Sequence, residues 1–310
     1  MPVTLQAKCI GSLALKALST QDSTADGQVV NTFSNSFYSK TATGELVFFT
    51  NRPLRSPITV NLDATCDFEH LVKPLEPLSA RGKEIRIGAD TIIELGSASL
   101  YESRVEPAGK LGPEFTRIGT SLRLASFVLE IIDTHQSVLD PHALAHSGVE
   151  EFVSDGVIRL RRKGTEEQFR DAALKIVGLG SGFTPSGDDT LGGFLATYNS
   201  FAKTTERAPI LLDSGLLEEK TSWISARLLD YMQRLILDEQ LHHLIDSATK
   251  GDQDAVVIAL QALLPRGHTS GIDIAVGAIL ALSLIQDIAF EKEETEVIAR
   301  ALGLRDLVVS

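Results

Sequence analysis

The spacing of hydrophobic residues differs between the first part of the chain and the rest. Near its start, short runs alternate apolar and polar residues, and Ile58, Val60 and Leu62 fall on one face of such a run, as in a strand with one buried face. From Ile118 onward, apolar residues recur every three or four positions, which is typical of amphipathic helices. Strands followed by helices predict an α+β protein, with a β-rich N-terminal domain over 1–112 and a mostly α-helical C-terminal domain over 113–310.

The N-terminal segment contains several further strand signals. The runs 83–87 and 91–95 are rich in isoleucine and are separated by Gly88, Ala89 and Asp90, so they predict a β-hairpin. The runs 45–50 and 29–38 are two more candidate strands, each rich in β-branched or aromatic residues.

Helices are predicted at five places in the second segment. A stripe of residues runs from Ile118 to Ile132, and a second helix over 169–177 stops at Gly178. The segment 223–248 predicts one long helix or two. Asp252 is a capping residue for a helix over 254–264, and the last strong helix begins near Ser270.

Composition narrows the class of protein. The 310 residues are 43% hydrophobic with a net charge of −12, and an acidic chain repels nucleic-acid phosphates, so we expect no nucleic-acid partner. The longest apolar run, 274–285, is too short to span a bilayer and predicts a buried core helix. Without a secretory signal or a disulfide framework, we expect a cytoplasmic protein with no membrane contact.

One pattern, Ser-Gly-x-Asp-x-x-x-Gly, occurs twice, each time before an apolar run. The copies lie in PSGDDTLGG (185–193) and TSGIDIAVG (269–277). A capping box explains a serine with an acid three residues later, but not the glycine four residues after that acid. Asp and Gly at this spacing share one helix face. We therefore expect two helices that cross near Gly193 and Gly277, with both N-termini and the acids Asp189 and Asp273 close to one space.

Two helix N-termini that face one space provide backbone N–H groups for an anion. The glycines that precede the first copy allow the loop to turn its amides inward, as phosphate-binding loops do. The carboxylates of Asp188, Asp189 and Asp273 would repel an anion. Either a Mg²⁺ ion lies between them and the ligand, or they hold the loops by hydrogen bonds and face away. The sequence leaves both open.

Two residues next to the second copy can take part in chemistry. Arg266, which we expect to be exposed, can bind a carboxylate or phosphate through two parallel hydrogen bonds. His268 can relay a proton near neutral pH. The alternative is a surface arginine and a histidine bonded to the backbone.

The two glycine-rich stretches, GLGSGFTPSGDDTLGG and RGHTSGIDIAVG, resemble the signature segments of the AllH subunit family of oxamate carbamoyltransferase. SNSFYSK (34–40), SPITVNLD (56–63) and KTSWISARLLDYM (220–232) are similar to weaker segments of that family. The resemblance implies a subunit that acts with two partner proteins in anaerobic allantoin and purine catabolism. The implied reaction interconverts oxalurate plus phosphate with oxamate plus carbamoyl phosphate.

This reaction suits a pocket lined by N–H donors, because attack by phosphate on the ureido carbonyl builds an oxyanion. Phosphate is itself the nucleophile, so no protein nucleophile is needed. We assign substrate and phosphate binding to Gly180, Gly182, Thr184, Ser186, Gly187, Thr269, Ser270 and Gly271. The candidate catalytic residues are Asp188, Asp189, Arg266, His268 and Asp273. The three aspartates are also the candidate Mg²⁺ ligands.

Two other functions fit the same residues. In one, the chain is a stand-alone Mg²⁺-dependent enzyme that acts on a phosphorylated or nucleotide substrate. In the other, it is a non-catalytic subunit whose glycines serve only helix packing.

Overall fold

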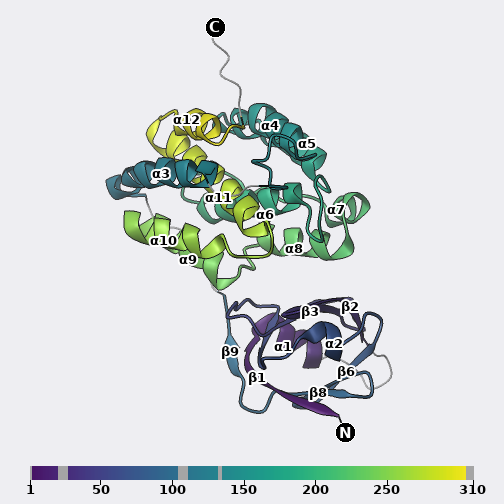
Figure 1. Ribbon diagram of the computed structural model, residues 1–310. Helices are drawn as coiled ribbons and strands as arrows, with labels where there is room; N and C mark the ends of the chain where they lie inside the picture. Colours follow the sequence, from purple (N-terminus) through teal and green to yellow (C-terminus); the bar gives the residue numbers. More distant parts are fainter. Residues whose placement is uncertain (1, 20–26, 104–110, 132–134, 305–310) are drawn as a thin grey trace. The chain divides into compact units, whose positions relative to one another are not determined.

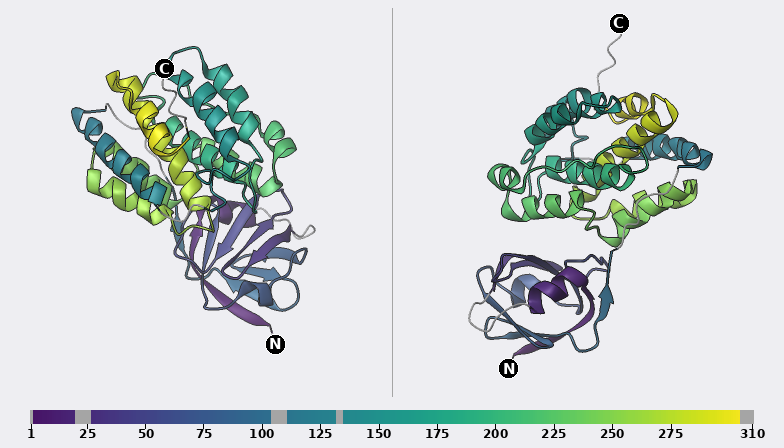
Figure 2. Two further views of the ribbon diagram at one scale, coloured as in Figure 1. Left: turned by 45° about the horizontal axis from the view of Figure 1, so that its top comes forward. Right: turned by 180° about the vertical axis from the view of Figure 1, so that it is seen from behind.

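The computed structural model describes residues 2–19, 27–103, 111–131 and 135–304, and Figures 1 and 2 show its helices and strands. The chain divides into two compact units, 1–104 and 105–310. The first is β-rich and the second helical, so the predicted α+β class is confirmed. Ile132, the last residue of the predicted apolar stripe, lies outside the described residues.

The first unit is a closed β-barrel. Its strands among the described residues are β1 (Val3–Gly11), β2 (Gly27–Phe33), β3 (Ser36–Lys40), β4 (Leu46–Thr50), β5 (Thr59–Asp63), β6 (Pro77–Arg81), β7 (Glu84–Ile87), β8 (Thr91–Glu94) and β9 (Ser99–Tyr101). They pair in the order β5-β4-β3-β2-β6-β7-β8-β1, and β1 closes the ring by pairing with β5; β9 is added beside β1. The pairs β4–β5, β1–β8 and β1–β9 are parallel. Closure leaves the eight ring strands without a free edge.

The barrel interior follows from the alternation in the sequence. Val60 and Leu62 of β5 are buried in its core with Phe37 and Phe49, whose rings stack 4.5 Å apart. Two short helices, α1 (Ser12–Ser19) and α2 (Phe68–Leu71), complete this core. The predicted hairpin is β7–β8. The run 29–38, expected as one strand, spans parts of β2 and β3, which form an antiparallel hairpin, because the segment turns at 34–35.

The second unit is all helical. Its elements are η1 (Pro113–Arg117), α3 (Ile118–Ile131), α4 (His146–Glu151), the π-helix η2 (Phe152–Val157), η3 (Arg159–Arg161), α5 (Glu166–Ile176), α6 (Ser186–Phe201), α7 (Ser214–Lys220), α8 (Trp223–Gln233), α9 (Glu239–Lys250), α10 (Gln253–Leu263), α11 (Ser270–Phe290) and α12 (Glu294–Ala301). The segment 223–248 is therefore two helices. Asp252 caps α10 as predicted, because its side chain accepts a hydrogen bond from the Ala255 amide.

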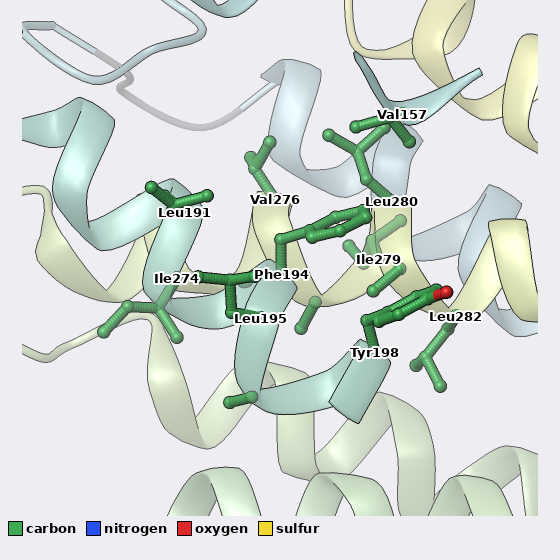
Figure 3. Packing of buried hydrophobic residues seen from close by; sticks show 14 of the residues in the cluster. Val157, Leu191, Phe194, Leu195, Tyr198, Ile274, Val276, Ile279, Leu280 and Leu282 are labelled. Carbon is green, nitrogen blue, oxygen red and sulfur yellow. The ribbon is translucent and has the colours of Figure 1, made fainter. Parts of the chain in front are cut away.

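Helices α6 and α11 form the centre of this unit. Every residue of α6 is buried, as is α11 from Gly271 to Asp287, and Figure 3 shows their apolar side chains packed together with Val157 of η2. The predicted core helix is thus confirmed, but α11 is longer than the apolar run 274–285 from which it was predicted. With 21 residues, α11 is long and apolar enough to cross a membrane; the 89% burial of its most apolar window is what a core helix shows.

The two central helices cross at their glycines. A Cβ atom on Gly193 would lie less than 3.0 Å from the backbone carbonyl of Ile274, and one on Gly277 equally close to the carbonyl of Thr190. These two contacts are equivalent in the repeat, since each glycine meets the residue that follows the aspartate of the other copy. The predicted crossing is therefore confirmed, and it sets the backbones in direct contact.

The crossing makes a prediction about stability. We expect Gly193→Ala to lower the free energy of unfolding by about 1–3 kcal/mol, because the added methyl group meets the backbone of α11. Gly192→Ala is the matched control in the same helix, because its methyl group meets the flexible end of Met232 instead. Urea unfolding of the two variants compares them. Equal losses would contradict the crossing as the source of the constraint.

Candidate functional site

The starts of α6 and α11 converge on one threonine. The Thr184 hydroxyl donates a hydrogen bond to Asp189 Oδ2 at 2.8 Å and lies 3.0 Å from Ser270 Oγ. Asp189 and Asp273 are close enough for their charges to repel and raise the pKa of Asp189. The repeat thus brings its two acids together, as expected from the sequence.

The glycines before α6 and those in the first turns of α6 and α11 have different roles. Gly180 and Gly182 have φ angles of +113° and +104°, a region that side chains rarely adopt. The amides of Gly187 and Gly271, however, donate to backbone carbonyls of Leu179 and Arg266, both at 2.9 Å. These two amides, which we expected to bind an anion, already have a partner.

Neither serine of the repeat caps its helix, so the capping-box alternative is wrong. The N-cap residues are Pro185 and Thr269, and neither has a side-chain capping bond. The Ser186 hydroxyl donates instead to the carbonyl of Gln136 at 3.1 Å. Both hydroxyl groups therefore make long-range contacts at the site.

Asp188 holds a loop to two helices. Its carboxylate accepts hydrogen bonds from the amide of Gly178 at 2.7 Å and from the hydroxyl groups of Thr221 and Ser225. Burial raises its pKa, and these three donors oppose that rise. The sequence showed Thr221 and Ser225 only as part of a similar segment, without a role. This geometry matches the alternative in which an aspartate holds the loops.

Asp189 and Asp273 are the most perturbed acids of the site. Burial raises the pKa of Asp189 to about 7 and that of Asp273 to about 6. In each case nearby hydroxyl groups oppose the effect, and for Asp189 the charge of Arg266 does so too. Perturbed buried acids are common at functional sites, although structural networks produce them as well.

A segment that the sequence did not indicate covers the start of α11. The Ser137 hydroxyl and the Val138 amide donate to Asp273 Oδ1 at 2.7 and 2.9 Å. Gln136 has φ of +69°, unusual for a residue with a side chain, and His146 bonds the Val138 carbonyl at 2.7 Å. No local sequence signal marks this segment, because its role depends on contacts about 135 positions away.

Arg266 and His268 differ from each other in the structure. The Arg266 side chain is only 22% exposed and pairs with the buried carboxylate of Asp238, the N-cap of α9. Our expectation of an exposed arginine is therefore wrong, since the acid that binds it was not recognised from the sequence. His268 is exposed on the loop before α11.

The aspartates do not form a metal centre in the described part of the chain. Within those residues, no group of three or more His, Cys, Asp or Glu side chains could hold a metal ion. Asp188 is bonded to Gly178, Thr221 and Ser225, whereas Asp189 and Asp273 have partners of their own. The role of Mg²⁺ stays a prediction from the sequence.

A separate apolar cavity of about 100 Å³ lies between α3, α10 and α11. Its lining includes Leu124, Leu260, Leu264 and Ile279, with Gln261 as its polar side chain. None of the sequence-predicted site residues lines it.

The part of the chain that carries this geometry matches one family model. Residues 176–282 match the family model of the oxamate carbamoyltransferase subunit AllH. The match supports an AllH-like family. This AllH-like segment, residues 176–282, contains both copies of the repeat, the hydrogen-bond partners of Asp188, and Asp238. The barrel lies outside it. No curated protein and no solved structure matches the chain.

The buried acid at the start of α6 predicts that the stability of the protein depends on pH. Because the folded state raises the pKa of Asp189 from 3.8 to about 7, it holds the proton more tightly than the unfolded chain. Stability due to this group therefore falls as pH rises from about 4 to about 7. We expect Asp189→Asn to match the wild type near pH 4 and to be more stable above pH 7, by at most about 4 kcal/mol at about 1.4 kcal/mol per pKa unit.

Urea unfolding between pH 4 and pH 8 measures this difference. Asp213→Asn, at the exposed N-cap of α7, is the control, and its effect should not change with pH because asparagine caps equally well. A constant difference between Asp189→Asn and the wild type would contradict the prediction.

The pair between Arg266 and Asp238 predicts a second effect. Arg266→Ala leaves the buried carboxylate of Asp238 without its cation, and we expect a loss of about 1–3 kcal/mol. Arg159→Ala removes an exposed pair with Asp155, which is worth about 0–1 kcal/mol. Thermal unfolding of both variants checks the contrast. Equal melting temperatures would show that Arg266 is not needed to hold the start of α9.

Proposed function

We propose that the chain is a subunit of a carbamoyltransferase complex that interconverts oxalurate plus phosphate with oxamate plus carbamoyl phosphate. In this proposal the substrate binds where the starts of α6 and α11 meet. The observation that carries the proposal is the Thr184 hydroxyl, which contacts both Asp189 and Ser270 and so joins the two signature stretches at one point. The AllH-like segment includes both stretches.

The charges near this point are compatible with a small anion. Arg266 lies close enough to Asp189 to lower its pKa, and the exposed His268 stands two residues away on the same loop. Burial raises the pKa of Asp189 to about 7, so the group is mostly protonated below that pH and repels an anionic ligand less than an ordinary aspartate does. We propose that Arg266 binds the carboxylate or phosphate end of the substrate and that His268 relays a proton.

The chemistry needs no nucleophile from the chain. A phosphate oxygen attacks the ureido carbonyl carbon of oxalurate, and the carbonyl oxygen takes up negative charge. The bond from this carbon to the oxamate nitrogen then breaks, and the nitrogen takes up the proton that phosphate loses, which gives oxamate and carbamoyl phosphate. Hydroxyl and amide donors at the helix starts stabilise an oxyanion if they are free to turn toward it. A family named as a subunit implies partner subunits, and we propose that they complete the pocket.

A second candidate is a structural subunit without a substrate site of its own. The specific observation in its favour is that the Gly187 and Gly271 amides are bonded within the chain. In addition, Gly193 and Gly277 are in close contact with the opposing backbone. In this candidate, the two glycines serve only to let the helices pack closely, and ligands bind to the partner subunits.

Ligand protection separates the two candidates. We expect inorganic phosphate or oxamate to raise the melting temperature, because a ligand at a hundred times its Kd stabilises the folded state by about 2.7 kcal/mol. Thr184→Val should lose this protection, since it removes the hydroxyl group that joins the two helix starts. Thr205→Val, at the other end of α6, is the matched control and should keep it.

The measurement is made on the full chain and on the complex purified from its native cells. If phosphate, oxamate and carbamoyl phosphate all fail to protect either form, the proposed substrate site is wrong and the structural candidate stands.

A further inference from the structure

One polar atom at the site differs from the others. Asp273 is fully buried, and its Oδ2 has no hydrogen-bond partner. Among the described residues that we assigned to the site, no other buried side-chain polar atom lacks a hydrogen-bond partner. Leaving a buried acceptor unpaired is costly, and for a charged group the cost is larger. A native structure that keeps such an atom at a candidate site indicates a missing donor.

The orientation of Asp273 is fixed on its other side. Oδ1 accepts from the Ser137 hydroxyl and the Val138 amide, so the carboxylate cannot turn without losing both bonds. The next residue, Ile274, is in backbone contact with Gly193. These contacts fix the position of the carboxylate and leave Oδ2 without a donor from the described part of the chain.

The surroundings of this carboxyl group belong to the site. The hydroxyl groups of Ser186 and Thr269, at the starts of the two helices, lie close enough to lower the pKa of Asp273. The Ser186 hydroxyl already donates to the Gln136 carbonyl. Asp189 lies near enough for electrostatic repulsion. The carboxyl group of Asp273 therefore lies beside the starts of both helices.

We propose that Asp273 Oδ2 accepts a hydrogen bond from the –NH₂ group of the bound carbamoyl or primary-amide compound. This inference rests on the proposed function and names the residue that recognises the substrate's uncharged end. It gives a reason for an acid in a site for anions: the acid binds the amide donor, while the anionic end lies toward Arg266 and His268.

Oxamate and pyruvate provide a matched pair of probes. They share the α-keto-carboxylate shape and differ in one group, –NH₂ against –CH₃. Pyruvate would leave the buried Oδ2 without a donor, and a site built to bind an N–H group rejects an analogue without it. We expect the complex purified from its native cells to bind oxamate at least tenfold more tightly than pyruvate, measured by calorimetry.

Two variants with the same chemical change test the residue. Asp273→Asn should abolish the preference, because Ser137 and Val138 fix the amide oxygen at Oδ1 and leave an –NH₂ group facing the ligand. Asp287→Asn is the control on the same helix, since Asp287 is a buried acid whose oxygens accept from the amides of Glu294 and Thr295. It should keep the preference for oxamate.

A measurement on the wild type covers the case in which Asp273→Asn does not fold. With ¹⁵N-labelled oxamate, the bound amide protons should shift downfield in the NMR spectrum and exchange more slowly with water. Unshifted, freely exchanging protons in bound oxamate would overturn the inference, as would a preference that survives in a folded Asp273→Asn variant.

The remaining outcomes separate this inference from the proposed function. Equal affinity for oxamate and pyruvate, with protection by phosphate intact, overturns the role of Asp273 and leaves the carbamoyltransferase proposal standing. If the complex binds neither compound and phosphate gives no protection, both are wrong.

Discussion

The backbone contact between α6 and α11 is the constraint on which the helical unit depends. Gly193 lies against Ile274 and Gly277 against Thr190, so neither helix can move outward or rotate without opening a gap at the other glycine. Close approach also explains why both helices are buried over nearly their whole length. Because each glycine stands four residues after an aspartate, the same contact that packs the core determines where the two acids lie.

Packing at this distance has an electrostatic consequence. Asp189 and Asp273 are taken out of water together, and burial raises the pKa of both. The chain offsets this cost with hydrogen-bond donors such as Thr184, Ser137 and the Val138 amide. Such a network is costly when any member is unpaired, and Asp273 Oδ2 is such a member.

The site combines parts that have different requirements. Asp188 has all its donors within the chain, and it stabilises the Gly178 loop against Thr221 and Ser225. Arg266 holds the start of α9 through Asp238 and at the same time affects the charge of Asp189. We therefore expect substitutions at these residues to lower the stability of the helical unit. Asp273 is different, because one oxygen accepts two hydrogen bonds within the chain and the other has no partner among the described residues.

The sequence by itself determined the two periods, and with them the β-rich and helical units. It also determined the repeat and, through Gly193 and Gly277, the crossing, because glycine spacing within one helix is a local property. Only the tertiary structure decided that the barrel closes through β1 and β5, that Arg266 pairs with Asp238, and that Ser137 reaches Asp273 across 136 positions. Those pairs join residues far apart in the chain, and no local pattern records which buried acid a distant donor will meet, because the folded packing alone brings them together.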